Sequence, residues 1–149
     1  MPATTTPAPV PDVTAAWQRV LLLHARVESR LATALQRRHG IGLSEFRALG
    51  HLAASPTSEL RMQELADKVG LNQSSVTRLV ARLNAAGFAY RDLCPDDRRG
   101  VYTVLTETGR ARHAEAGRTY EETLQAALEE AAQADPRLAA ALSALGATP

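Results

Sequence analysis

Between residues 73 and 82 the chain places short hydroxyl side chains beside arginines. A hydroxyl donates and accepts hydrogen bonds with little bulk, and a guanidinium can pair with two acceptors at once. Together these groups suit the base edges and phosphates that line a DNA major groove. The candidate contact residues are Gln73, Ser74, Ser75, Thr77, Arg78 and Arg82. The simpler alternative is a helical hairpin whose polar side chains are only solvated.

The apolar residues of this segment predict the element that would position these groups. They recur at i, i+3, i+4 and i+7, which predicts a helix with one buried stripe made of Val76, Leu79, Val80 and Leu83. Asn72 is the expected N-cap of this helix. Gly70 is the expected end of a preceding helix, whose apolar face is Leu65, Ala66 and Val69. The sequence therefore predicts two short helices joined by a sharp turn.

A β-hairpin is predicted directly after the second helix, which Gly87 is expected to close. Two β-rich runs, 88–93 and 101–105, flank the turn-forming segment CPDDRRG. Arg98 and Arg99 would lie at the tip of this ribbon and could enter a narrow minor groove. Asp97 is close enough in sequence to hold Arg99 in one rotamer. The alternative is an exposed turn with solvated charges.

From Leu43 to Gly109 the sequence resembles the MarR family of bacterial winged-helix regulators. The resemblance is carried in order by LSEF at 43–46, ELA at 64–66, SSVTRLV at 74–80, GF at 87–88, DRR at 97–99 and LTETGR at 105–110. It implies that Ser74, Ser75, Thr77 and Arg78 touch bases and phosphates. It also implies that Arg99 reaches the minor groove. Gln73 departs from the family pattern in detail and is a candidate for sequence specificity.

The whole chain is expected to be mainly α-helical with a small β-hairpin wing. Its 149 residues suit one domain, 12–149, in which a winged helix-turn-helix core at 43–106 is flanked by dimerisation helices at 12–40 and 107–146. Asp12 or Thr14 should cap the first helix, Ser44 a second through Ala54, and Thr106 a long one to about Ala134. Pro136 should begin a short last helix that ends near Gly146.

Charge and composition agree with a near-neutral protein that carries one basic face. The net charge is only +1, but arginines gather in 78–99 while the run 115–135 is mostly acidic. Residues 1–11 are rich in proline, lack the features of a signal peptide and are expected to be a disordered tail. No apolar run has membrane-spanning length, and one cysteine, Cys94, suggests a reducing cytoplasm.

The terminal helices carry more apolar surface than a small winged core can cover. The surplus is Trp17, Leu21, Leu124, Leu128, Leu138, Leu142 and Leu145. In the family that the chain resembles, such helices interlock into a two-fold dimer, and one recognition helix alone buries too little surface for tight operator binding. A homodimer on a pseudopalindromic double-stranded operator is therefore expected. The alternative is a terminal helix that folds back on its own subunit.

The resemblance also implies a small aromatic or phenolic effector held between the dimer helices and the winged domain. The residues available for such a cleft are Trp17, Leu21, His24, Phe46 and Arg47, with Arg47 pairing with an acid group. Equally, Trp17 could be an interface anchor and Arg47 a solvated cation.

Enzyme chemistry finds no support in the sequence, which lacks HExxH, CxxC, GxSxG and phosphate-loop motifs. We expect no cofactor and no metal, because His24 and Glu28 are more simply a surface pair. The favoured function is a repressor released by a small ligand. The alternatives are a winged-helix module that binds protein, and an oxidant sensor acting through Cys94.

Overall fold

The computed structural model describes residues 12–93 and 100–147. Its elements follow the chain in the order α1 (Val13–His39), α2 (Leu43–Ala54), β1 (Glu59–Arg61), α3 (Met62–Val69), α4 (Gln73–Ala85), β2 (Ala89–Leu93), β3 (Val101–Leu105), α5 (Glu107–Ala134) and α6 (Pro136–Gly146). The expected fold class, mainly helical with a small β wing, is confirmed.

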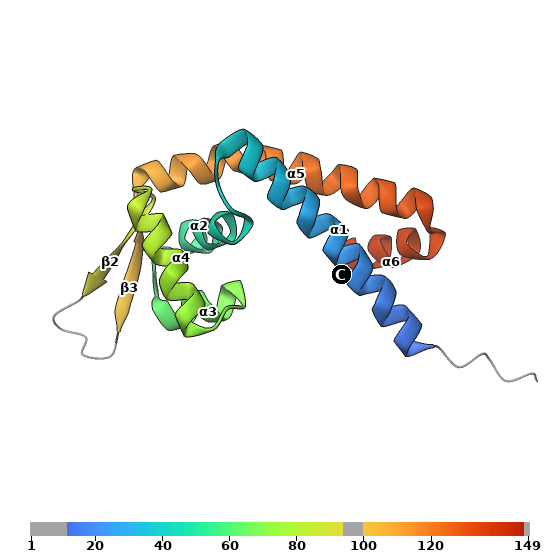
Figure 1. Ribbon diagram of the computed structural model, residues 1–149, viewed down its shortest axis with the longest axis horizontal. Coiled ribbons are helices and arrows are strands. Elements are labelled where there is room, and N and C mark those ends of the chain that lie inside the picture. Colours follow the sequence, from blue (N-terminus) through green and yellow to red (C-terminus); the bar gives the residue numbers. More distant parts are fainter. Residues whose placement is uncertain (1–11, 94–99, 148–149) are drawn as a thin grey trace, which may run out of the picture.

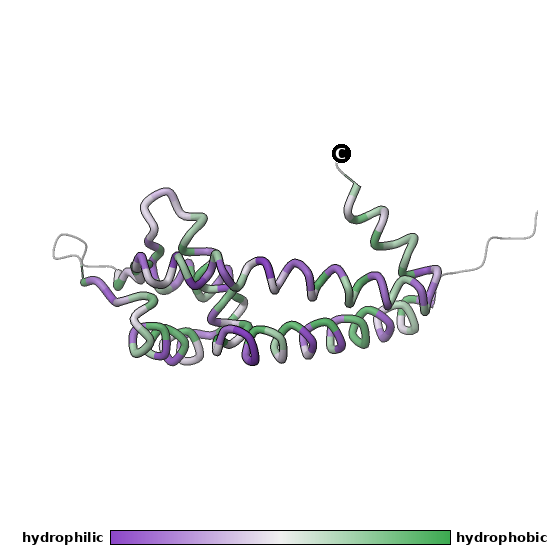
Figure 2. Tube along the Cα trace, turned by 90° about the horizontal axis from the view of Figure 1, so that it is seen from above, coloured by the Kyte–Doolittle hydropathy of each residue, from purple (hydrophilic) through white to green (hydrophobic). Residues whose placement is uncertain are grey.

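The molecule has two parts (Figure 1). We call α2 to β3 the winged core, and α1, α5 and α6 together the helical arm. The two long helices α1 and α5 pack along one another and extend away from the winged core, while the first turns of α5 remain against it. Seen from above, α6 turns away from the pair of long helices (Figure 2).

Most helix ends lie where local chemistry predicts them. The Asp12 side chain accepts from the Ala15 amide at 3.0 Å, the Asn72 side chain from the Ser75 amide at 2.8 Å, and the Thr106 hydroxyl from the Gly109 amide at 3.0 Å. Each of these bonds satisfies an amide that has no partner within its helix. Gly70 takes the left-handed conformation, with φ of 78°, that the sharp turn between α3 and α4 requires.

The start of α2 differs from the prediction, because Ser44 is not its N-cap. The helix begins at Leu43, two residues earlier than a cap at Ser44 would place it, and Gly42 is the capping residue. Glu45 explains the shift, since its Oε2 accepts from the Gly42 amide at 3.1 Å and so satisfies the helix start from inside the first turn.

The sheet has one strand more than the predicted hairpin. The strand order is β1-β3-β2 and both pairs are antiparallel. The hairpin itself is confirmed, with Ala89 opposite Leu105 and Leu93 opposite Val101. The added strand β1 is three residues long and places Leu60 opposite Thr103. A three-residue strand is too short to show an alternating pattern in sequence, which is why it was missed.

The main hydrophobic core lies inside the winged core and reaches the end of α1 through Leu35. A second, smaller cluster of Val27, Leu31 and Ala127 joins α1 to α5. The predicted stripe of α1 is therefore buried only in its second half. Toward the N-terminus the large apolar side chains are exposed: Val13, Trp17, Val20, Leu21 and Leu22. Within the described ranges, no helix is both long and apolar enough to cross a membrane.

Candidate nucleic-acid interface

Helix α4 is held firmly on one side and open on the other. All four predicted stripe residues, Val76, Leu79, Val80 and Leu83, are 0% exposed. Leu65 and Ala66 of α3 are buried in the same cluster. Because a packed interior resists displacement, the outward face of α4 has a fixed orientation relative to the wing. This is the arrangement that a helix needs in order to present side chains to a groove.

The hydroxyls on the first turn of α4 have local partners. The Ser74 hydroxyl donates to the Asn72 side chain at 2.9 Å, and the Thr77 hydroxyl donates to the Gln73 carbonyl at 2.8 Å. Each hydroxyl has used its one hydrogen and keeps oxygen lone pairs for an incoming donor. Ser74, Thr77 and Gln73 are exposed and Ser75 is half-buried, so this turn is accessible.

The two arginines of α4 differ in their surroundings. The Nε of Arg82 donates to Oε1 of Glu45 at 3.0 Å, while the other oxygen of that carboxylate caps α2. The Nη groups of Arg82 take no part in this bond. Arg78 is exposed, and no acidic side chain pairs with it within the described part of the chain. Arg78 is therefore the freer of the two to make a bidentate base contact.

The predicted wing-tip residues Asp97, Arg98 and Arg99, and also Cys94, lie outside the described residues. Their roles remain predictions. The described chain ends before them at Leu93 of β2 and resumes just before Val101, the first residue of β3.

The structure adds one basic residue beside the wing that the sequence reasoning did not single out. Arg61, at the end of β1, donates from Nε to the Tyr102 hydroxyl at 3.0 Å and lies 5.5 Å from the centre of that ring. Only the pairing of β1 with β3 brings Arg61 there, so no local sequence signal could have identified it.

The five predicted effector residues lie in different surroundings. Trp17 and Leu21 are exposed on α1, and Phe46 is 7% exposed inside the core. A groove of about 760 Å³ does exist elsewhere in the helical arm. It lies between α1, α5 and α6, and it is lined by residues such as Leu22, Arg26, Ala127 and Leu138 and by none of the five.

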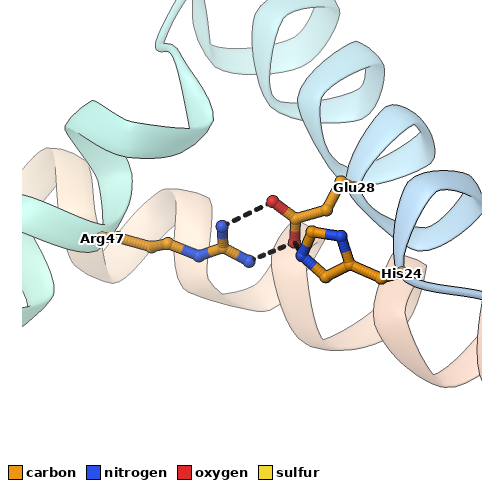
Figure 3. A network of polar contacts seen from close by, with 3 residues as sticks. All are labelled: His24, Glu28 and Arg47. Carbon is orange, nitrogen blue, oxygen red and sulfur yellow. Dashed lines mark hydrogen bonds and ion pairs between the residues drawn. The ribbon is translucent and has the colours of Figure 1, made fainter. Parts of the chain in front are cut away.

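Arg47 is joined instead to α1, as Figure 3 shows. Its Nη1 and Nη2 donate to the two oxygens of Glu28 at 2.7 and 2.6 Å. His24 lies one turn away, with Nε2 3.9 Å from the same carboxylate. The bonds from Arg47 lower the pKa of Glu28 despite partial burial, and the same bonds, aided by the Tyr120 hydroxyl, raise the pKa of Arg47.

The arrangement of metal-binding side chains decides whether the described chain offers a possible metal site. Across the described ranges, no three His, Cys, Asp or Glu side chains come together in a way that could hold an ion. The histidines also have structural partners: His39 shares a hydrogen bond with Thr119 at 2.7 Å, and His113 stacks on Phe46.

A two-helix unit with a packed second helix, followed by a β-ribbon, defines a winged helix-turn-helix protein. A sequence model of the MarR family matches residues 39–100, from the end of α1 to the residue before β3. Most of the winged core therefore matches the MarR family of winged-helix transcriptional regulators, and the fold of the chain is similar to that of MarR family regulators of known structure.

Three solved structures give the extent of the likeness. Sco3205 of Streptomyces coelicolor, a MarR family regulator in complex with DNA, is 26% identical, with a TM-score of 0.74 over 96% of this chain and 93% of its own. AbsC, from the same organism, is 23% identical, with a TM-score of 0.73 over 93% and 97%. BpsR of Bordetella bronchiseptica, whose DNA binding is regulated by 6-hydroxynicotinic acid, is 19% identical, with a TM-score of 0.72 over 93% and 94%. A search of curated protein sequences found no significant match.

Proposed function

We propose that this chain is a sequence-specific DNA-binding regulator that represses transcription as a homodimer and is released by a small ligand. The observation that carries the proposal is the state of α4. Its apolar stripe is 0% exposed, whereas Ser74, Thr77 and Arg78 are exposed on the side away from the core. A helix so oriented can enter a major groove without any rearrangement of its own domain. The structure of Sco3205 with DNA supports the same mode of use.

The exposed apolar side chains of the helical arm support the homodimer. Trp17 is 59% exposed and Leu22 is 53% exposed, and Leu22 also lines the groove between α1, α5 and α6. Contiguous apolar surface of this kind is typical of a site that another chain covers. A second copy would bury it and would also supply the second recognition helix that a pseudopalindromic site needs.

A small ligand that releases DNA would have to prefer a dimer whose two α4 helices are wrongly spaced for the operator. The regulation of BpsR by 6-hydroxynicotinic acid supports an aromatic acid as the class to test first. Arg47 is then the cation of interest, and an acid would have to compete with Glu28 for it. A titration with hydroxylated aromatic acids tests this: Arg47→Met should respond at higher concentrations than the wild type.

The test of the main proposal is selection of bound fragments from random double-stranded DNA. We expect a pseudopalindrome whose half-site centres are about 10 base pairs, or a near multiple, apart. Arg78→Ala should weaken binding to that site by about 1–3 kcal/mol and relax the preference at one base pair of each half-site. Arg137→Ala, an exposed arginine on α6, is the matched control and should bind as the wild type does.

A uniform loss for Arg78→Ala on every sequence would instead make Arg78 a phosphate contact. Selection of no sequence by the wild type would favour the other candidate, a winged helix that binds protein. Reversal of charge at Arg78 and Arg99 separates the two functions, because it should abolish operator binding but have little effect on binding to a protein partner.

A further inference from the structure

The side chain of Arg47 joins helices from both parts of the molecule. It projects from α2 in the winged core and forms a two-point ion pair with Glu28 on α1 in the helical arm. The Tyr120 hydroxyl of α5 also favours the charged form of Arg47 and so helps to raise its pKa. Among the ion pairs of the described residues, this one alone connects α1 to the winged core.

The neighbouring residue, Phe46, joins α2 to α5. Phe46 stacks between His113 and Tyr120 of α5, with ring centres 4.8 Å apart in both pairs. Consecutive residues of α2 therefore bind to both long helices, Phe46 to α5 and Arg47 to α1. The three helices α1, α2 and α5 form a closed triangle at this point.

The ion pair lies far enough along α1 from the connection to α2 that a small rotation between the two helices would break it. Helix α1 ends at His39 and joins α2 through the short connection 40–42. Glu28 lies eleven residues before that end, which at 1.5 Å per residue is roughly 16 Å from the connection. Turning the winged core by about 5° around the connection would move Arg47 by roughly 1.4 Å, enough to lengthen a 2.6 Å bond beyond hydrogen-bonding range.

We propose that Glu28 and Arg47 form a brace that fixes the angle between the helical arm and the winged core, and thereby positions α4 for one half-site spacing without touching DNA. The proposal rests on the function proposed above. In a two-fold dimer the arms are the shared part, so the angle between arm and core sets the separation of the two α4 helices.

The exposure of the pair separates this positioning role from a stabilising one. The side chains of Arg47 and Glu28 remain 34% and 27% exposed, and ion pairs at such sites add little to the free energy of unfolding. Variants that break the pair should therefore fold as the wild type does, with a changed geometry as the main effect.

The first experiment measures affinity for the selected operator and for versions with the half-sites moved one base pair apart or together. The wild type should prefer its own spacing strongly. In Glu28→Gln and in Arg47→Met, that preference should fall by about fivefold, mainly through better binding to the altered spacings. The double variant should equal the single ones, because both act through one contact.

The matched control is Arg30→Met, which breaks the ion pair between Arg30 of α1 and Glu130 of α5. That pair lies within the helical arm, so its loss should leave the spacing preference unchanged. An unchanged preference in Glu28→Gln and Arg47→Met would overturn the brace, as would an equal loss of preference in Arg30→Met.

A second experiment needs no DNA. Spin labels at Gln18 of α1 and Asp67 of α3, in a Cys94→Ser background diluted with unlabelled protein, report the distance between arm and core within one chain. Glu28→Gln should broaden a distance distribution that is narrow in the wild type, and Arg30→Met should not. If the wild type selects no DNA but this broadening occurs, the brace stands and the proposed function fails; no broadening removes the brace whatever the protein binds.

Discussion

Gly109 lies where the first turn of α5 passes the backbone of Phe88. A Cβ at this position would meet the Phe88 carbonyl oxygen at 2.1 Å and its carbon at 2.8 Å. Backbone atoms of a packed strand entry cannot rotate out of the way, so the close approach requires glycine. This close contact places the first turn of α5 against the residue that precedes β2.

We predict that Gly109→Ala destabilises the fold by about 2 kcal/mol or more, because the backbone must shift to admit one methyl group. Gly117, two turns further along α5, is the matched control, since a Cβ there meets nothing within 4 Å. Gly117→Ala should stabilise by roughly 0.5–1 kcal/mol through helix propensity. Urea unfolding at one fixed protein concentration measures both. Equal effects of the two changes would show that the contact at Gly109 is relieved without cost.

At the scale of elements, α2 is the helix through which the winged core and the arm are connected. Its residues contact α4 through Glu45, α1 through Arg47, and α5 through Phe46. Gly50 lies against α5 as Phe46 does: the Nε2 of His113 is 2.9 Å from the position that a Cβ on Gly50 would take. Burial, and then the charge of Arg110, lower the pKa of His113 in the folded protein.

This packing predicts a loss of stability in mild acid. A depressed folded-state pKa means that the unfolded chain binds the proton more readily. The contribution of His113 is therefore complete above its ordinary pKa of about 6.5 and is lost as the pH falls below that value. The melting temperature should drop between pH 7.5 and pH 5.5, and His113→Gln should reduce the drop.

His51 provides the comparison for this experiment. Its pKa is lowered by burial and by Lys68, so His51→Gln should remove a separate part of the same drop. The two changes should add, since the residues have no shared partner among those causes. A pH profile that His113→Gln leaves unaltered would contradict the role assigned to its burial.

At the scale of the whole molecule, the helical arm keeps large apolar side chains exposed. Leu22→Glu should convert a dimer into a monomer, because it puts a charge on apolar surface that the proposed partner covers. The residue is already 53% exposed, so the monomer should retain its helical content. Sedimentation measures the first effect and circular dichroism the second.

The control is Tyr90→Glu on β2, an exposed apolar residue of the wing at 45%. It should leave the dimer intact. A dimeric Leu22→Glu protein would place the interface elsewhere than on this face of α1.

The sequence by itself determined the helices, most of their ends and the buried face of α4. In these features each residue lies within four positions of the next: Asn72 and Ser75 at a cap, or Val76, Leu79, Val80 and Leu83 in a stripe. Helical periodicity and capping are local, so a single chain read alone reveals them. The same local regularity made the family resemblance visible along 43–109.

Only the tertiary structure decided which side chains meet. Arg47 was predicted as an effector-binding cation, and its partner Glu28 lies nineteen residues away on another helix. Arg82 was predicted to face DNA, and Glu45, thirty-seven residues away, holds its Nε. Strand β1 exists because β3 pairs with it, since three residues carry no pattern of their own. Such contacts depend on how helices and strands cross, and the crossing is set by the packing of the whole core rather than by any local spacing.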